Sequence, residues 1–318
     1  MLMPEATVSS IVAKVEELLE SPRGTEKVAQ LKGHFDRLAK NRDALREQIR
    51  RLRARKDVAF YGSVGNLKAE RLEIDVRIAG ISCGKVDLVP HRDERRFRPE
   101  NCAVPFAGES RDWGHAAVSR YLQAAKVDLL CRSREATIES ALLVEMSKES
   151  SEGKLRPLLW HQPVKLARLP FQFPLPISAR GELKIPGGTS AGHADILARA
   201  RIAGRDRLRV FEVKKDDAPD IAHALDQAVA YCAALKYLLV RFPATYFSAS
   251  GFGRVRKNLV LDAVAFVPAK AEAYRYVESA ADRLAKGGTQ FGLCAQFFHW
   301  EVAAGGKALV IEGERRYV

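Results

Sequence analysis

The chain has 318 residues, of which 47% are hydrophobic and 29% are charged, and its formal net charge at pH 7 is +13. The length suits one large domain or two ordinary ones with a buried core, and no apolar run is long enough to span a membrane. The positive charge favours a polyanionic partner, most often nucleic acid, although it is also compatible with solubility alone.

We predict a helical arm over residues 1–57. Residues 10–56 have helical periodicity, and from Leu31 apolar residues recur at the spacing of a heptad seam, at Phe35, Leu38, Leu45, Ile49 and Leu52. Two interpretations stay open: a helical hairpin packed on the protein body, and a coiled coil that joins a second copy or a partner protein. The N-terminus lacks the basic and apolar regions of a secretory signal, so we expect a cytoplasmic location.

Residues 58–110 are predicted to form a β-hairpin and a linker region. Apolar residues alternate with charged ones over residues 72–78, which is the period-2 pattern of a half-buried strand. A turn at Cys83-Gly84 would lead into a second strand. The polar, proline-containing segment 90–112 then predicts a domain boundary.

Residues 111–318 are predicted to form one α/β domain. Its elements in order are helices at 113–125 and 135–148, a proline-broken β-rich stretch at 158–179, the hairpin GHADILARARIAGRDRLRVFEVKK at 192–215, a helix at 220–239, a strand at 258–268, a helix at 271–286 and a final strand region. The order αβββαβ predicts a mixed β-sheet flanked by helices.

The five cysteines and seven histidines are scattered, without the spacing of a zinc site. We interpret the cysteines as reduced, buried, small residues. His161 and His193 lie near the residues discussed next, and we interpret both as structural.

Three charged side chains interrupt the apolar strands of the 192–215 hairpin. Asp195 stands in the first strand, and Glu212 and Lys214 share one face of the second because side chains alternate with a period of two. Pairing of the strands can bring Asp195 beside Glu212. A surface salt bridge between Glu212 and Lys214 is the alternative, but the apolar residues on both faces of the strand argue against it.

Two adjacent carboxylates in an apolar setting repel each other, and a hard divalent cation resolves that conflict. Mg²⁺ takes oxygen ligands and commonly uses one or two carboxylates, with Mn²⁺ as an acceptable substitute. A lysine beside the cation can orient or deprotonate an attacking water and stabilise charge on a phosphoryl oxygen. Asp195, Glu212 and Lys214 therefore form a complete set for phosphodiester hydrolysis.

The surroundings distinguish this Glu-x-Lys tripeptide from the two others in the chain. Glu152 to Lys154 falls in a predicted loop, and Glu182 to Lys184 runs into Pro-Gly-Gly. Only Glu212 to Lys214 lies in an apolar strand and precedes a long amphipathic helix. On that helix Gln227 and Tyr231 are four residues apart and share a face, from which they could flank the carboxylates.

The pattern GHADI…FEVKK…DQAVAY resembles the PD-(D/E)XK nuclease superfamily and, within it, the RecB-like branch. The branch shows Gly-x-x-Asp, Glu-x-Lys and a helical Gln-x-x-x-Tyr, which here are Gly192 with Asp195, Glu212 with Lys214, and Gln227 with Tyr231. The resemblance covers residues 135–267 and does not include the helical arm. It implies a restriction-endonuclease-like fold. Ala194 replaces the proline of the family name, a common variation that puts little in doubt.

The resemblance implies roles for these residues. Asp195, Glu212 and the carbonyl of Val213 would bind Mg²⁺, and Lys214 would serve the nucleophilic water. Gln227 and Tyr231 would position the site or the DNA. The family also places an acidic residue on the helix before the core strands, for which the candidates are Glu135, Glu139 and Glu145; we favour Glu139.

We therefore expect a Mg²⁺-dependent deoxyribonuclease, a metal-dependent phosphodiesterase that acts as an endonuclease in restriction, recombination, repair or defence against foreign DNA. The alternative is a catalytically silent nucleic-acid-binding module or assembly subunit with the same fold. DNA against RNA, single against double strands, and endo- against exonucleolytic cutting stay open. Two basic segments, 46–56 and 251–258, are each interpreted either as a nucleic-acid contact or as an ordinary solvated helix face or turn.

Overall fold

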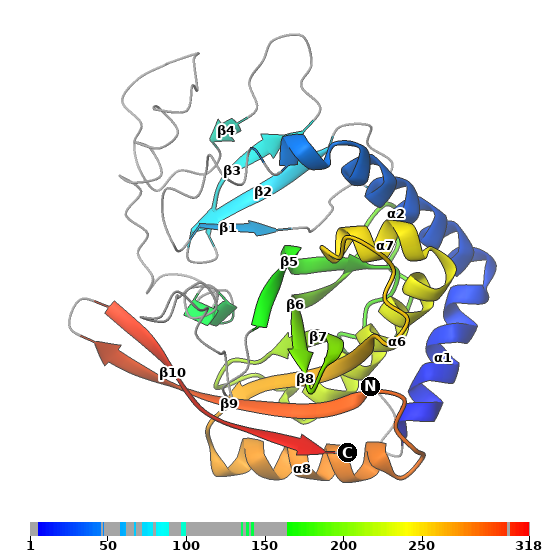
Figure 1. Cartoon of the computed structure of the whole chain (residues 1–318). Helices are drawn as coiled ribbons and strands as arrows, with labels where there is room; N and C mark the ends of the chain where they lie inside the picture. The colour runs from blue at the N-terminus through cyan, green and yellow to red at the C-terminus, as the bar shows by residue number, and fades with distance from the viewer. Residues whose placement is uncertain are drawn as a thin grey trace.

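The computed structural model describes residues 6–45, 47, 58–61, 67, 72–78, 81–88, 97–99, 135, 138–139, 141–142, 164–303 and 306–317. Several predicted features lie outside these residues: the basic segment 46–56 apart from residue 47, most of the linker 90–112, the helix 113–125, Glu145, Glu152 to Lys154 and His161. Within the described part the protein is mixed α/β, with helices packed around a large sheet (Figure 1).

Ten strands form the sheet. They are β1 (Val58–Tyr61), β2 (Glu73–Ile78), β3 (Ile81–Asp87), β4 (Phe97–Pro99), β5 (Val164–Leu175), β6 (Gly192–Ile202), β7 (Arg205–Val213), β8 (Val260–Pro268), β9 (Gly292–Ala303) and β10 (Gly306–Tyr317). Their order across the sheet is β10-β9-β8-β7-β6-β5-β1-β2-β3-β4. β7, β8 and β9 are parallel neighbours, and β5 to β7 form an antiparallel meander. The predicted mixed sheet is confirmed.

The described helices are α1 (Val8–Glu20), α2 (Pro22–Lys40), η1 (Ile221–His223), α6 (Ala224–Arg241), α7 (Pro243–Ala249) and α8 (Ala271–Ala285). None of these described helices is both long enough and apolar enough to cross a membrane. The bounds of η1, α6 and α8 confirm the helices predicted at 220–239 and 271–286.

The predicted arm helix is broken at Ser21. Its side chain accepts a hydrogen bond from the amide of Gly24, and Pro22 occupies the first turn of the new helix, which is a standard start signal. Gly24 also lets α2 fold back on α1, because a Cβ there would overlap the carbonyl of Leu18. The heptad pattern indicated the apolar face correctly but missed this corner, which depends on capping and close backbone contact.

Helix α2 packs on the body of the protein. The described seam residues are all buried in the main hydrophobic core: Leu31, Phe35, Leu38 and Leu45. The Phe35 ring stacks on Phe173 of β5 with 5.2 Å between ring centroids, and the ammonium of Lys27 donates to the carbonyls of Gly188 and Ser190 just before β6. This part of the seam makes the intramolecular contacts of the hairpin interpretation, while Ile49 and Leu52 lie outside the described residues.

The β6–β7 hairpin is covered on both faces. Leu208 and Val210 of β7 face the core that contains α6, whereas Phe211 and Val213 face a second, smaller core on the other side of the sheet. In Figure 1, α6 lies behind the strands and α1 and α2 run along one side of the molecule. The prediction of strands buried on both faces is confirmed.

Two details of the strand predictions need correction. Cys83 and Gly84 do not form the predicted turn, since both lie inside β3, where Gly84 pairs with Val76 next to a register shift. Glycine inside a strand often marks a bulge, and the register shift beside Gly84 is an irregularity of this kind. In addition, three residues of the predicted linker form β4, which pairs with β3.

Candidate active site

Two buried carboxylates lie side by side at one end of the β6–β7 hairpin. Ile196 pairs with Phe211, so the next residues along the strands, Asp195 and Glu212, lie opposite each other and share one face. Asp195 is 3% exposed and Glu212 is 1% exposed. The Oδ2 atom of Asp195 accepts a hydrogen bond of 2.8 Å from the amide of Val213. The sequence prediction that the hairpin brings Asp195 beside Glu212 is confirmed.

Lys214 is also buried, and it bridges two acidic side chains. Its Nζ atom donates to Oε1 of Glu212 at 3.0 Å and to Oδ2 of Asp220 at 2.7 Å. Burial alone would lower the pKa of Lys214, but Glu212 and Asp220 outweigh it and raise that pKa. The ammonium therefore stays charged at neutral pH and acts as a hydrogen-bond donor.

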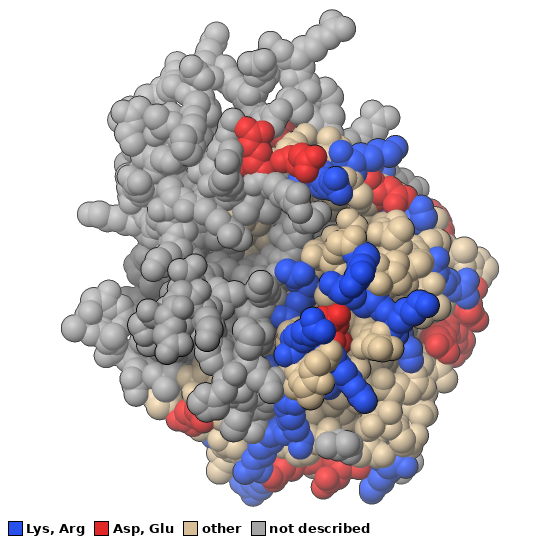
Figure 2. All heavy atoms as spheres, in the orientation of Figure 1, with Lys and Arg blue, Asp and Glu red and all other residues tan. Residues whose placement is uncertain are grey.

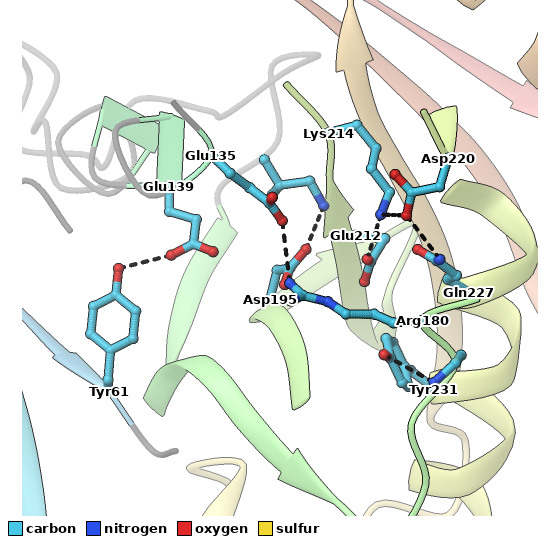
Figure 3. A network of polar contacts seen from close by, with 12 residues as sticks. Tyr61, Glu135, Glu139, Arg180, Asp195, Glu212, Lys214, Asp220, Gln227 and Tyr231 are labelled. Carbon is cyan, nitrogen blue, oxygen red and sulfur yellow. Dashed lines mark hydrogen bonds and ion pairs between the residues drawn. The ribbon is translucent and has the colours of Figure 1, made fainter. Parts of the chain in front are cut away.

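Helix α6 supplies two further side chains to this cluster (Figure 3). Gln227 donates from Nε2 to Oδ2 of Asp220 at 3.2 Å, on the same oxygen that accepts from Lys214. The hydroxyl of Tyr231 accepts a hydrogen bond of 3.3 Å from the amide of Ala179. Gln227 thus contacts the charged network, whereas Tyr231 holds the backbone next to it.

The backbone held by Tyr231 leads into a turn that carries Arg180. Ser178 pairs with Lys184 across this turn, and Arg180 extends from it toward the carboxylates (Figure 3). The guanidinium lies 3.4 Å from Oε1 of Glu135, and the side chain is 66% exposed. Although burial acts in the opposite direction, Asp195, Glu135 and other acidic groups raise the pKa of Arg180. Arg180 is therefore a fixed positive charge at the open side of the site.

Close backbone packing explains why glycine stands at position 192 in the Gly-x-x-Asp pattern. A Cβ at this position would overlap the carbonyl of Ile177, so only glycine lets β6 begin this close to the 177–178 backbone. The same contact places the Arg180 turn next to Asp195. The glycine therefore brings two parts of the site together.

Glu139 lies on the other side of the carboxylate pair, in the helical segment around 138–142. Its Oε2 atom accepts a 2.8 Å hydrogen bond from the hydroxyl of Tyr61 in β1. Burial, followed by the charge of Asp195, raises the pKa of Glu139 to about 8. Glu139 therefore interacts with the site through the charge of Asp195. Glu135 contacts Arg180, and Glu145 lies outside the described residues.

Three buried acidic side chains, Asp195, Glu212 and Glu139, lie close together and would repel one another if all were ionised. Burial and the neighbouring Glu212 raise the pKa of Asp195 well above its ordinary value, and burial also raises the pKa of Glu212 although Lys214 opposes the change. Each shift shows that the charged carboxylate is disfavoured where it stands. A cation of higher charge than the Lys214 ammonium would relieve this strain.

The donor atoms fit a hard divalent cation. Within the described residues, Oε2 of Glu212 is buried without a hydrogen-bond partner, which leaves a carboxylate oxygen free for a ligand bond. Asp195, directly opposite, would supply a second carboxylate, and Val213, which follows Glu212 and donates its amide to Asp195, carries the backbone carbonyl expected as third ligand. No cluster of three or more His, Cys, Asp and Glu side chains in the described part is arranged to hold a metal, so the fit depends on this smaller oxygen set.

His193 is buried beside the site. Burial, followed by the charge of Arg180, lowers the pKa of His193 to about 4, so the imidazole is neutral at physiological pH. Its Nε2 atom has no hydrogen-bond partner among the described residues. The interpretation of His193 as structural stays a prediction.

Three residues of the network were not predicted as site residues: Asp220, Arg180 and Tyr61. Asp220 and Arg180 have a weak signal in the sequence, since Asp220 precedes Gln227 by two helical turns and Arg180 precedes a glycine in a turn. Tyr61 has none, because 78 positions separate it from Glu139. Sequence distance hides contacts that only the sheet order creates.

The chain was also compared with known proteins. No protein-family model matches it, and searches of curated proteins and of solved structures found no significant similarity. The functional argument therefore rests on the residues and on their arrangement.

Proposed function

We propose that this protein is a Mg²⁺-dependent nuclease of the PD-(D/E)XK type that hydrolyses phosphodiester bonds in DNA. The observation that carries the proposal is the juxtaposition of Asp195, Glu212 and Lys214 at the buried end of the β6–β7 hairpin. Structural ion pairs are usually satisfied by one partner of each sign, whereas this site places two acids of raised pKa, Asp195 and Glu212, beside one lysine.

The order of elements supports a restriction-endonuclease-like core within the mixed sheet. The antiparallel strands β5, β6 and β7 are followed by α6, which crosses one face of the sheet and leads through α7 to β8, the parallel neighbour of β7. This arrangement places the Asp195–Glu212 pair beside Gln227 on α6. Each element of the resembled pattern thus has a place next to the same carboxylates.

In phosphodiester hydrolysis, metal binding and water orientation would fall to different residues of the site. Asp195, Glu212 and the Val213 carbonyl would hold the divalent cation, which when bound activates water and neutralises charge on a phosphoryl oxygen. Lys214 stays protonated, so it orients the attacking water and donates a hydrogen bond to the developing negative charge. Because Lys214 is already protonated, a group other than Lys214 would accept the proton of the attacking water.

Two further residues shape the site. Oε2 of Glu212 would bind the cation while Oε1 keeps its hydrogen bond to Lys214, and Asp220 holds the ammonium from the other side. Arg180 is an exposed cation beside the carboxylates, where it would bind a phosphate of the substrate. The site therefore combines buried carboxylates with an exposed arginine, as expected for a phosphodiester bound beside a metal ion.

The test is cleavage of supercoiled plasmid, linear single-stranded DNA and RNA with Mg²⁺, Mn²⁺ or EDTA. We expect metal-dependent cutting that Asp195→Asn, Glu212→Gln and Lys214→Ala each abolish. The matched controls are Glu182→Gln and Lys184→Ala, which alter an exposed Glu-x-Lys of the same spacing. Full activity in any of the three site variants contradicts its role, and a wild-type protein that binds DNA without cutting it favours the catalytically silent alternative.

A further inference from the structure

A second cluster of charge lies at the opposite end of the β6–β7 hairpin from the carboxylates. Six cationic residues from the hairpin and from the loop after α7 make up this arginine surface: Arg199, Arg201, Arg205, Arg254, Arg256 and Lys257. Figure 2 shows lysine and arginine side chains gathered around an acidic one over this region. The basic segment 251–258 of the sequence forms half of the surface.

The structure brings two of these arginines together in spite of their like charges. The guanidinium groups of Arg199 and Arg256 lie 5.4 Å and 5.6 Å from the ring centroid of Phe252. Arg199 also donates to the carbonyl of Gly251 at 2.8 Å. Burial and the charge of Arg256 both lower the pKa of Arg199, a sign of uncompensated positive potential.

The loop that supports them is anchored. Phe252 is buried against Phe247 of α7, with 5.8 Å between ring centroids, and its amide donates to the carbonyl of Phe247. Gly251 has a φ of +83°, a conformation that favours glycine. The aromatic ring therefore holds the arginines in a defined arrangement, which reduces the entropy that a ligand must remove on binding.

Acidic partners are few on this surface. Asp206 lies 3.5 Å from Arg256, but the exposed Arg201, Arg205, Arg254 and Lys257 have no ion pair in the described part of the chain. The neighbouring Arg207, by contrast, forms a two-point ion pair with the buried Asp262. The hairpin thus pairs Arg207 with a carboxylate and leaves its exposed cations available to a ligand.

We propose that the arginine surface binds the phosphate backbone of a nucleic acid, as a contact site separate from the proposed active site. Exposed cations beside a fixed arginine pair can contact phosphates, and these contacts need no base sequence. Arg201 follows Asp195 by six residues along β6, which corresponds to about 20 Å. This inference rests on the proposed function only in taking nucleic acid as the ligand.

The test measures binding without cleavage. A labelled DNA duplex of about 30 base pairs is titrated in EDTA by fluorescence anisotropy over about 0.05–0.2 M salt. One variant carries Arg201→Gln, Arg205→Gln, Arg254→Gln and Lys257→Gln. The control carries Arg23→Gln, Lys40→Gln, Arg275→Gln and Lys286→Gln, which removes the same charge from exposed positions on α2, on α8 and just after it.

We expect the surface variant to lose more than about tenfold in affinity at about 0.1 M salt, and its slope of log K against log salt to become shallower by about 2–4. The control should stay within about threefold of the wild-type affinity. Equal losses in both variants, or no loss in the surface variant, would overturn the proposal. Because cutting is assayed separately, loss of binding by the surface variant would support this surface even if the wild-type protein proved not to be a nuclease.

Discussion

Lys214 and Asp220 form the shortest polar contact of the candidate site, with 2.7 Å between Nζ and Oδ2. Asp220 lies outside the sheet, just before η1, and its oxygen also accepts from Gln227. The lysine is therefore held from two sides, by a carboxylate that is expected to bind metal and by one that is not. This second support makes Asp220 a positioning residue.

Asp220→Asn should lower the rate of cleavage at saturating substrate by about tenfold to a hundredfold, because Lys214 loses one of the two charged acceptors that hold its ammonium. Steady-state kinetics measure the effect, with Asp217→Asn in the same loop as control. We expect KM to change little, since Asp220 contacts Lys214 and Gln227 and is not one of the proposed metal ligands. An Asp220→Asn variant with wild-type turnover would show that Asp220 does not position Lys214.

Glu139 should make stability depend on pH. Its pKa rises from 4.5 to about 8 on folding, so between these values the folded protein holds a proton that the unfolded chain has released. The free energy of unfolding should therefore fall as pH rises through this window, by up to about 1.4 kcal/mol per pH unit. Glu139→Gln keeps an acceptor for Tyr61 and should flatten the dependence. Urea midpoints at several pH values in EDTA measure it, and identical curves for both proteins would contradict the assignment.

Mg²⁺ should stabilise the protein through Asp195 and Glu212. At a concentration about 100 times its Kd, a cation that binds only the folded state adds about 2.7 kcal/mol to the free energy of unfolding. Thermal denaturation with and without Mg²⁺ measures this, and Glu212→Gln should lose the shift while the exposed Glu182→Gln keeps it. A shift that survives in Glu212→Gln would place the cation elsewhere.

Tyr231→Phe should weaken the turn that carries Arg180. The change removes the acceptor of the Ala179 amide, at a cost of about 1–3 kcal/mol in the free energy of unfolding. Tyr246→Phe is the control, because the Tyr246 hydroxyl is buried without a hydrogen-bond partner among the described residues and its loss should cost little. If Tyr231 acts through Arg180, Tyr231→Phe and Arg180→Ala should reduce cleavage less than additively. Fully additive losses would separate the two residues.

Gly192→Ala should destabilise the protein by at least about 1–3 kcal/mol, because the new methyl group would overlap the Ile177 carbonyl. Gly253→Ala is a matched control, since no atom lies within 4 Å of a Cβ at that position. Chemical denaturation compares the two variants. Equal stability would mean that the β6 backbone moves away freely, and the close approach would not be needed.

The local patterns of the sequence were enough for the hairpin and its charged residues. Periodicity placed Glu212 and Lys214 on one face of a strand, and strand pairing placed Asp195 opposite Glu212, because both depend on neighbours within about 20 residues. The helix that carries Gln227 and Tyr231 followed from its apolar stripe. The contacts of these two side chains could not be predicted in this way, since Tyr231 contacts a backbone amide 52 positions away.

What the sequence determined by itself was the set of chemical groups and the local geometry that alternation and helical spacing impose. Tertiary structure alone decided which distant groups come together: Tyr61 beside Glu139, Arg180 beside Glu135, and Phe252 against two arginines. These contacts arise from the order of strands in the sheet and from loop packing. Both depend on many weak interactions between residues that are distant in the sequence. No single stretch of residues predicts these contacts, because the free energy that stabilises them comes from interactions across the whole folded chain.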